Sequence, residues 1–143
     1  MSDADIVSMS ISNLITKASR VVGQHYQREC APLRITPSQA GIVWVLSLVG
    51  PRSQVEIASL LHLEKTNINA MVKKLQTAGL VTVQKTAEDA RRTEVALTQK
   101  GNALSKKLYR VDERVNDIIT SMVGSERDAK VIRRFLEKIV FAK

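Results

Sequence analysis

Apolar side chains in the first third of the chain recur at every third or fourth position, the period of an α-helix with one buried face. The pattern predicts a first helix over residues 6–29. It should end before Pro32, because the residue before a proline avoids the α conformation. A second helix is predicted over 36–48, with Thr36 as its cap and Pro37 at its first helical position. This helix is apolar on most faces, so we expect it at the centre of the core.

Two shorter helices separated by a turn follow. The first opens at Ser53 with Glu56 three residues further on, the arrangement of a capping box. The turn is expected over 62–65 and the second helix over about 66–78. Gly79 suits the left-handed residue that ends a helix. The apolar residues predicted to face the core are Val55, Ile57, Ala58, Leu60, Leu61, Ile68, Met71, Val72 and Leu75.

Beyond Gly79 the period of the pattern changes to two. Apolar or β-branched side chains alternate over residues 80–86 and again over 94–98, which predicts a β-hairpin. The segment between them, residues 87–92, carries charges and contains no glycine. It is also longer than a two-residue turn, so we expect a charged loop that protrudes from the body.

The last third of the chain returns to the helical period. Thr98 is expected to cap a helix that reaches Met122, and Ser125 to begin a last helix. The apolar positions of the long helix form a narrow stripe, typical of helices that pack together at a shallow angle. They are Leu104, Leu108, Val111, Val115, Ile118 and Met122. The first and the last two helices carry more apolar surface than one small domain needs. We therefore expect a C2 dimer, with folding back onto the same chain as the alternative.

Five stretches stand out by their order and spacing. They are Leu33–Gln39, Val55–Leu61, Leu75–Val81, Asp89–Arg92 and Leu97–Gly101. Together they resemble the MarR (multiple antibiotic resistance regulator) family of bacterial and archaeal transcription factors, over nearly the whole chain. The resemblance implies one domain over 1–143, mainly α-helical with a small β-hairpin wing. Residues 36–98 would form the winged helix-turn-helix that binds DNA, and 1–35 and 99–143 the dimerisation helices.

In this arrangement the second short helix enters the major groove. A dimer would read two half-sites of a pseudo-palindromic operator, about 10 bp apart. Asn67 and Asn69 can pair with adenine edges, and the methyl group of Thr66 can touch a thymine methyl. The lysines that can reach phosphates or guanine edges are Lys65, Lys73 and Lys74. The alternative for each of these residues is an ordinary solvated helix face.

The hairpin tip offers a second contact with DNA. Arg91 or Arg92 would enter the adjacent minor groove, where A·T-rich sequence concentrates negative potential. In the family an aspartate two residues before an arginine braces that arginine, and Asp89 with Arg91 matches this pattern. Ser53 and Gln54 could hold a phosphate at a helix N-terminus. Helix capping alone also explains Ser53, and exposed charge near a hairpin tip also explains the arginines.

Composition agrees with a DNA-binding protein without proving one. The net charge of +8 and the isoelectric point of about 9.9 suit a polyanionic partner. Residues 61–100 contribute +3 and residues 101–143 contribute +4, so the charge is not confined to the predicted DNA-binding helix. Aromatic residues make up only 3% of the chain, which leaves little for base stacking on single strands.

The sequence offers no sign of an enzyme, a metal site or a cofactor. It has no glycine-rich phosphate loop, no paired histidines and no catalytic triad, and His25 and His62 stand alone. No apolar run approaches the roughly 20 residues that span a bilayer. Asp3 and Asp5 lie where a signal peptide would be basic. The single cysteine fits a reducing compartment, so we expect a cytoplasmic protein.

The resemblance also implies regulation by a small effector, often aromatic or anionic, bound between the dimer helices and the DNA-binding region. His25, Tyr26 and Trp44 are candidates for this pocket, although Trp44 lies in the most apolar helix and suits the core equally well. A redox-responsive regulator using Cys30 is one alternative. Glu29 would raise the pKa of that thiol, and the neighbouring arginines would lower it. The other alternative is a winged helix that serves only as a protein-interaction or non-specific nucleic-acid-binding module.

Overall fold

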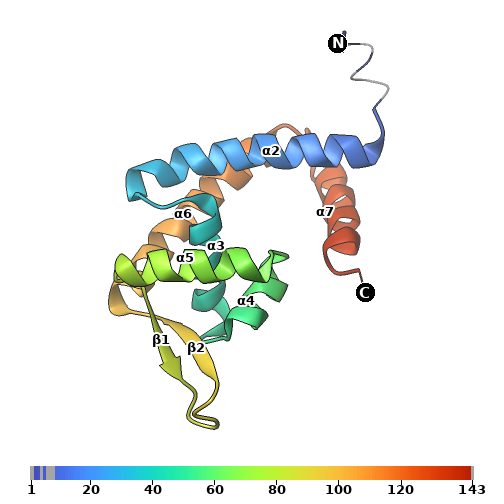
Figure 1. Cartoon of the computed structure of the whole chain (residues 1–143). Coiled ribbons are helices and arrows are strands. Elements are labelled where there is room, and N and C mark those ends of the chain that lie inside the picture. Colours follow the sequence, from blue (N-terminus) through green and yellow to red (C-terminus); the bar gives the residue numbers. More distant parts are fainter. Residues whose placement is uncertain (1, 4, 6–8, 143) are drawn as a thin grey trace.

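The computed structural model describes residues 2, 3, 5 and 9–142 and has the predicted elements in the predicted order, together with one short 3-10 helix that was not predicted. They are α2 (Ile11–Cys30), the short 3-10 helix η1 (Ala31–Leu33), α3 (Pro37–Val49), α4 (Gln54–Leu61), α5 (Lys65–Thr77), β1 (Val81–Lys85), β2 (Thr93–Leu97), α6 (Gln99–Ser121) and α7 (Glu126–Val140). In Figure 1 the hairpin projects from a body made of α3, α4 and α5, while α2 runs across the opposite side. The predicted class, mainly helical with a two-stranded wing, is confirmed.

Side-chain caps set the starts of most helices. Thr36 and Ser53 each form a complete capping box, with Gln39 and Glu56 respectively. Single caps begin three further helices, and they are Ser10, Thr98 and Ser125. The first helix was predicted to begin at residue 6, and residues 6–8 lie outside the described part of the chain. α2 itself begins at Ile11, because Ser10 is extended and its hydroxyl accepts a hydrogen bond from the Asn13 N–H at 3.3 Å.

The hairpin follows a left-handed turn at the end of α5. Gly79 has φ +75°, as expected, and the Leu80 N–H donates to the Leu75 carbonyl at 3.0 Å. β1 and β2 are antiparallel, with Val83 opposite Val95. Arg52 adds a single bridge on the free side of β2, through reciprocal backbone hydrogen bonds with Val95 of 3.1 and 2.7 Å. The wing is thereby attached to the start of α4.

The core is centred on α3, as predicted. This helix contacts α2, α4, α5, α6 and β2, and its Ile42 and Val43 are fully buried. The prediction that every apolar residue of α4 is buried is wrong, because Val55 and Leu60 are 55% and 49% exposed. α4 contacts only α3 and α5 closely, so its core face is one narrow side that carries Ile57. Within the described residues, no helix has the length and hydropathy needed to span a bilayer.

The first turn of α6 is in close contact with the residue that follows α5. A Cβ atom at Gly101 would lie 2.2 Å from the Leu80 carbonyl oxygen and 3.0 Å from a side-chain carbon of Leu97. Because the nearest atom belongs to the backbone, the contact cannot relax through a side-chain rotation. The residue must therefore be glycine for reasons of space.

We expect Gly101→Ala to lower the free energy of unfolding by about 1–3 kcal/mol, the usual effect of overpacking. Gly23→Ala in α2 is the matched control, since a Cβ atom there meets nothing within 4 Å. It should be neutral or stabilise by about 0.5–1 kcal/mol through helix propensity. Urea unfolding at one fixed protein concentration measures both. Equal effects of the two substitutions would contradict the close packing at Gly101.

Candidate nucleic-acid interface

α5 has one buried face and one exposed polar face. Ile68, Val72 and Leu75 are at most 1% exposed and fix the helix against the core. The candidate DNA-contacting residues of this helix are all exposed, and they are Lys65, Thr66, Asn67, Asn69, Lys73 and Lys74. An amide- and lysine-bearing face of this kind can offer hydrogen bonds to base edges and positive charge to phosphates.

A tight turn sets α5 against α4. His62 adopts a left-handed conformation with φ 53° and ends α4, and the Leu63 N–H donates to the Ala58 carbonyl at 2.9 Å. The turn is therefore one residue shorter than predicted, and α5 begins at Lys65 rather than Thr66. Glu64 occupies the N-cap position without a side-chain cap. This leaves the first N–H groups of α5 near Lys65 without a side-chain acceptor.

The wing loop is closed by its own hydrogen bonds, which explains how it turns without a glycine. The Thr86 hydroxyl donates to the Asp89 carbonyl at 2.7 Å and accepts from the Asp89 N–H at 3.0 Å. The expected contact between Asp89 and Arg91 is present. Asp89 Oδ1 accepts from the Arg91 backbone N–H at 2.9 Å and from Nε at 3.4 Å. The Arg91 side chain is nevertheless 92% exposed, so the brace orients it without burying it.

One groove joins the wing to the starts of α4 and α5. Its walls include Ser53, Gln54, Lys65 and Arg92 from the candidate set, together with acidic residues of the wing. The Ser53 hydroxyl accepts from the Glu56 N–H at 3.2 Å, so it has a capping role whatever else it binds. Hydrogen bonds from Ser53 lower the pKa of Glu56. The structure thus gathers part of the candidate set around this groove, between the α5 face and the wing tip.

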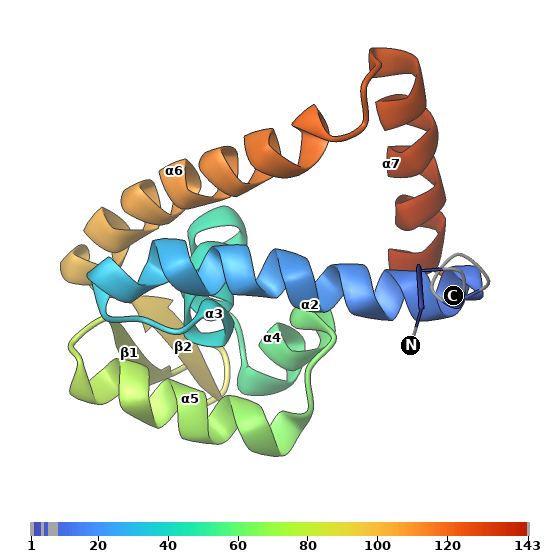
Figure 2. The same cartoon turned by 90° about the horizontal axis from the view of Figure 1, so that it is seen from above.

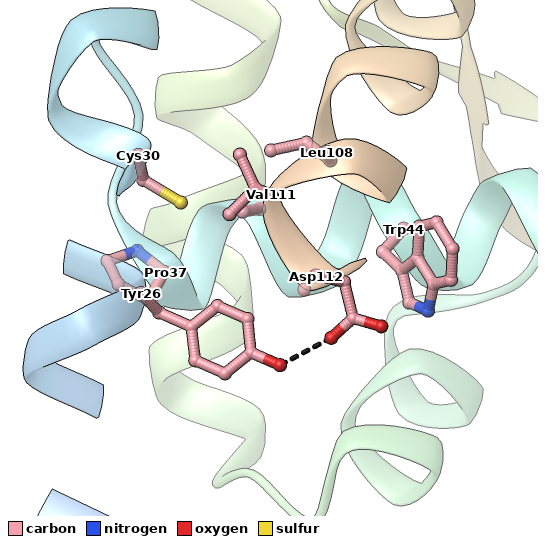
Figure 3. Close-up of a pocket in the computed structure, with 9 residues that line it drawn as sticks. Tyr26, Cys30, Pro37, Trp44, Leu108, Val111 and Asp112 are labelled. Atoms are coloured by element: carbon pink, nitrogen blue, oxygen red, sulfur yellow. Dashed lines mark hydrogen bonds between the residues drawn. The ribbon is translucent and has the colours of Figure 1, made fainter. Parts of the chain in front are cut away.

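A separate cavity of about 220 Å³ lies between α2, α3 and α6 (Figure 3). Tyr26 and Trp44 line it, as expected for an effector pocket, but His25 does not. The His25 Nδ1 atom instead lies 3.5 Å from a guanidinium nitrogen of Arg28, one turn along the same helix. His25 lies outside this cavity because the residue after it, Tyr26, occupies the face of α2 that meets the cavity.

Trp44 is not a core residue either, although its helix is the most apolar one. It is half-buried and its ring stacks on Tyr109 of α6, with centroids 5.8 Å apart. Sequence reasoning missed Asp112, which lines the same cavity and accepts a hydrogen bond from the Tyr26 hydroxyl. Nothing local marks Asp112, since its partner lies 86 residues away in the chain.

Cys30 is 1% exposed and lies in the wall of the same cavity. Burial raises the pKa of its thiol, and the neighbouring Glu29 carboxylate raises it further. The effect expected of Glu29 is thus present. Because the thiolate is the reactive form, a buried thiol with a raised pKa is a poor nucleophile. The geometry does not favour the redox alternative.

Comparison with known proteins decides the family. The sequence model described as MarR family matches residues 35–92, which span α3, α4, α5 and the hairpin up to the tip of the wing. Residues 35–92 of the chain are thus of the MarR family, a family of DNA-binding transcriptional regulators that are not enzymes. A curated relative is an uncharacterised HTH-type transcriptional regulator, YkoM of Bacillus subtilis (strain 168). It is 23% identical over 126 residues, which cover 87% of this chain and 82% of the relative.

Two solved structures show the same fold as this chain. A cysteine-to-serine variant of MarR from E. coli, complexed with operator DNA, is 19% identical with a TM-score of 0.84, covering 96% of this chain and 99% of that one. Bordetella bronchiseptica BpsR, studied for the regulation of its DNA binding by 6-hydroxynicotinic acid, is 20% identical with a TM-score of 0.84. The match covers 95% of this chain and 96% of BpsR.

We expect Cys30 to be unreactive in the folded regulator. A thiol reagent such as iodoacetamide should label it slowly at pH 7 and rapidly once urea has unfolded the chain, because the native thiol is buried and protonated. Operator binding should be equally insensitive to peroxide in the wild type and in Cys30→Ser. Rapid native labelling, or peroxide-induced DNA release that Cys30→Ser abolishes, would restore the redox alternative.

Proposed function

We propose that this MarR-family regulator is a homodimeric repressor of a pseudo-palindromic operator, relieved by a small aromatic effector, and that it acts in the cytoplasm. The observation that carries the proposal is the exposed polar face of α5 beside a wing whose Arg91 is held outward by Asp89. Two such units related by a two-fold axis would place α5 in successive major grooves, about 10 bp apart.

The chemistry of each side chain determines which part of the DNA we propose that it contacts. Asn67 and Asn69 pair with adenine edges, and the Thr66 methyl contacts thymine. Arg91 enters the minor groove, with Arg92 beside it. The residues assigned to phosphate contacts are Ser53, Gln54, Lys65, Lys73 and Lys74. The three lysines can also reach guanine edges. Phosphate contacts position the protein, whereas base contacts select the sequence.

Unpartnered apolar surface at both ends of the chain supports the dimer. α7 stands apart from the body in Figure 2, and none of its described residues is buried. Its apolar face includes Ile132, Phe135, Leu136 and Ile139, each 42–49% exposed. Further exposed apolar residues lie on α2 and around the end of α6, and they are Ile11, Leu14, Val21, Ile118 and Met122. We assign residues 1–35 and 99–143 to dimerisation and 36–98 to DNA binding, within a single domain over 1–143.

The position of the cavity supports regulation by an effector. It lies between α3 of the DNA-binding region and two helices assigned to dimerisation, α2 and α6. A ligand that fits one separation of these helices better than another shifts the distance between the two copies of α5. DNA affinity then falls by the difference in ligand affinity between the two states. The BpsR structure concerns regulation of DNA binding by 6-hydroxynicotinic acid, and control of DNA binding by a small molecule, of whatever charge, is proposed here.

Selection from random duplexes tests the DNA-binding proposal. We expect a palindromic winner, and we expect Arg91→Ala to weaken binding to it by about 1–3 kcal/mol. Arg127→Ala at the start of α7 is the matched control, because it removes the same charge at the end of the molecule far from the wing (Figure 1). It should have little effect. Equal binding to every duplex, with Arg91 dispensable, would instead support a non-specific or protein-interaction module.

Charged substitutions on the apolar face of α7 test the dimer. The double variant Phe135→Asp, Ile139→Asp should sediment as a monomer and lose most of its operator affinity, since each half-site would be bound alone. Arg134→Asp, on the opposite face of the helix, is the control and should remain dimeric. Both variants should keep their helical circular dichroism, because α7 contributes no buried residue to the described fold. A double variant that still sediments as a dimer would refute this interface.

A further inference from the structure

Asp112 is the one charged residue among the described residues that line the cavity between α2, α3 and α6. We propose that the cavity takes a small planar aromatic molecule with a positive charge, such as a protonated aromatic amine, and that Asp112 is its counter-ion. The proposal rests on the proposed effector function, because it assigns the chemical class of that effector. It narrows the class to cations and disfavours aromatic acids.

The carboxylate of Asp112 is available to a ligand. Its Oδ1 atom accepts a hydrogen bond from the Tyr26 hydroxyl, and within the described residues its second oxygen has no hydrogen bond or ion pair. Figure 3 shows the carboxylate directed into the space between Tyr26 and Trp44. An ammonium group placed there would satisfy the second oxygen and form a charge-assisted hydrogen bond.

Among the described residues, no basic side chain forms an ion pair with this carboxylate. Arg114, two residues further along α6, is held by Glu29 of α2, with Nε 2.9 Å from Oε2. Tyr26 is a donor, and burial together with the Asp112 carboxylate raises the pKa of its hydroxyl, so it stays protonated. Among the described lining residues none is basic. An anionic ligand in the cavity would therefore meet a like charge that no described lining residue offsets.

The walls of the cavity suit a flat aromatic ring. Trp44 is backed by Tyr109, which fixes its plane, and tryptophan is the strongest of the aromatic side chains in cation–π interactions. Small residues of α3, Ala40 and Gly41, leave room opposite α6. The volume of about 220 Å³ lies below the roughly 300–1,000 Å³ of sites for drug-sized ligands. One or two rings is therefore the expected size of the occupant.

Three probes of the same size separate charge from shape: benzylammonium, benzyl alcohol and benzoate. Trp44 is the only tryptophan, so its fluorescence reports binding at this cavity directly. In the wild-type dimer we expect benzylammonium to bind at least about tenfold more tightly than benzoate. Benzylammonium should also weaken operator binding at concentrations that change the Trp44 signal.

Asp112→Asn keeps the size of the side chain and an acceptor for Tyr26 but removes the charge. It should lower the affinity for benzylammonium by about tenfold, leave benzyl alcohol unchanged and remove the discrimination against benzoate. Glu113→Gln is the matched control. It removes the adjacent carboxylate of α6, which does not line the cavity. The variant should bind the three probes in the same order of affinity as the wild type.

The outcomes separate this inference from the proposed function. If benzoate binds the wild type best and releases operator DNA, the effector site stands and the charge assignment is overturned. If none of the probes changes Trp44 fluorescence while operator binding is normal, both the cation proposal and the effector role of this cavity fail, and the DNA-binding proposal is untouched. The wild-type order of affinities decides the question even if Asp112→Asn does not fold.

Discussion

The buried face of α5 packs on the core, and the end of α5 is also joined to the start of α6. Thr98 links the two: its hydroxyl donates to the Gly79 carbonyl at 2.6 Å, and its N–H donates to the Leu80 carbonyl at 3.0 Å. Lys100 Nζ donates to the Ala78 carbonyl at 2.7 Å. Carbonyls at the end of a helix need such partners. The N-cap and first turn of α6 supply them, so the end of α5 is hydrogen-bonded to the start of a helix assigned to dimerisation.

These hydrogen bonds connect α6, one of the helices around the cavity, to the end of α5, which is the connection that the proposed regulation needs. Tyr26 and Asp112 connect α2 to α6, and Glu29 and Arg114 connect the same two helices further along. Under the proposed regulation, a ligand between them would change the angle between these helices and the body. That change would reach the DNA-binding region through the contact between Gly101 and Leu80.

Local features of the fold could be predicted from the sequence, and long-range ones could not. Capping residues such as Thr36 and Ser53 act within three residues, so their signal is complete in the sequence. The half-exposed position of Trp44 and the exposure of Val55 depend on what packs against their helices, which helical periodicity does not specify. The role of Asp112 depends on a partner 86 residues away. The shape of α5 was therefore predictable, whereas the chemistry of the cavity was not.

The most direct test of the account is the affinity of the wild-type protein for a series of operators in which the spacing between two identical half-sites varies one base pair at a time. A two-fold dimer that inserts α5 into successive major grooves predicts one sharp maximum, at a centre-to-centre spacing of about 10 bp. Affinity should fall steeply when half a helical turn is added. An affinity independent of spacing, or equal for one half-site and two, would contradict the dimeric recognition on which the account depends.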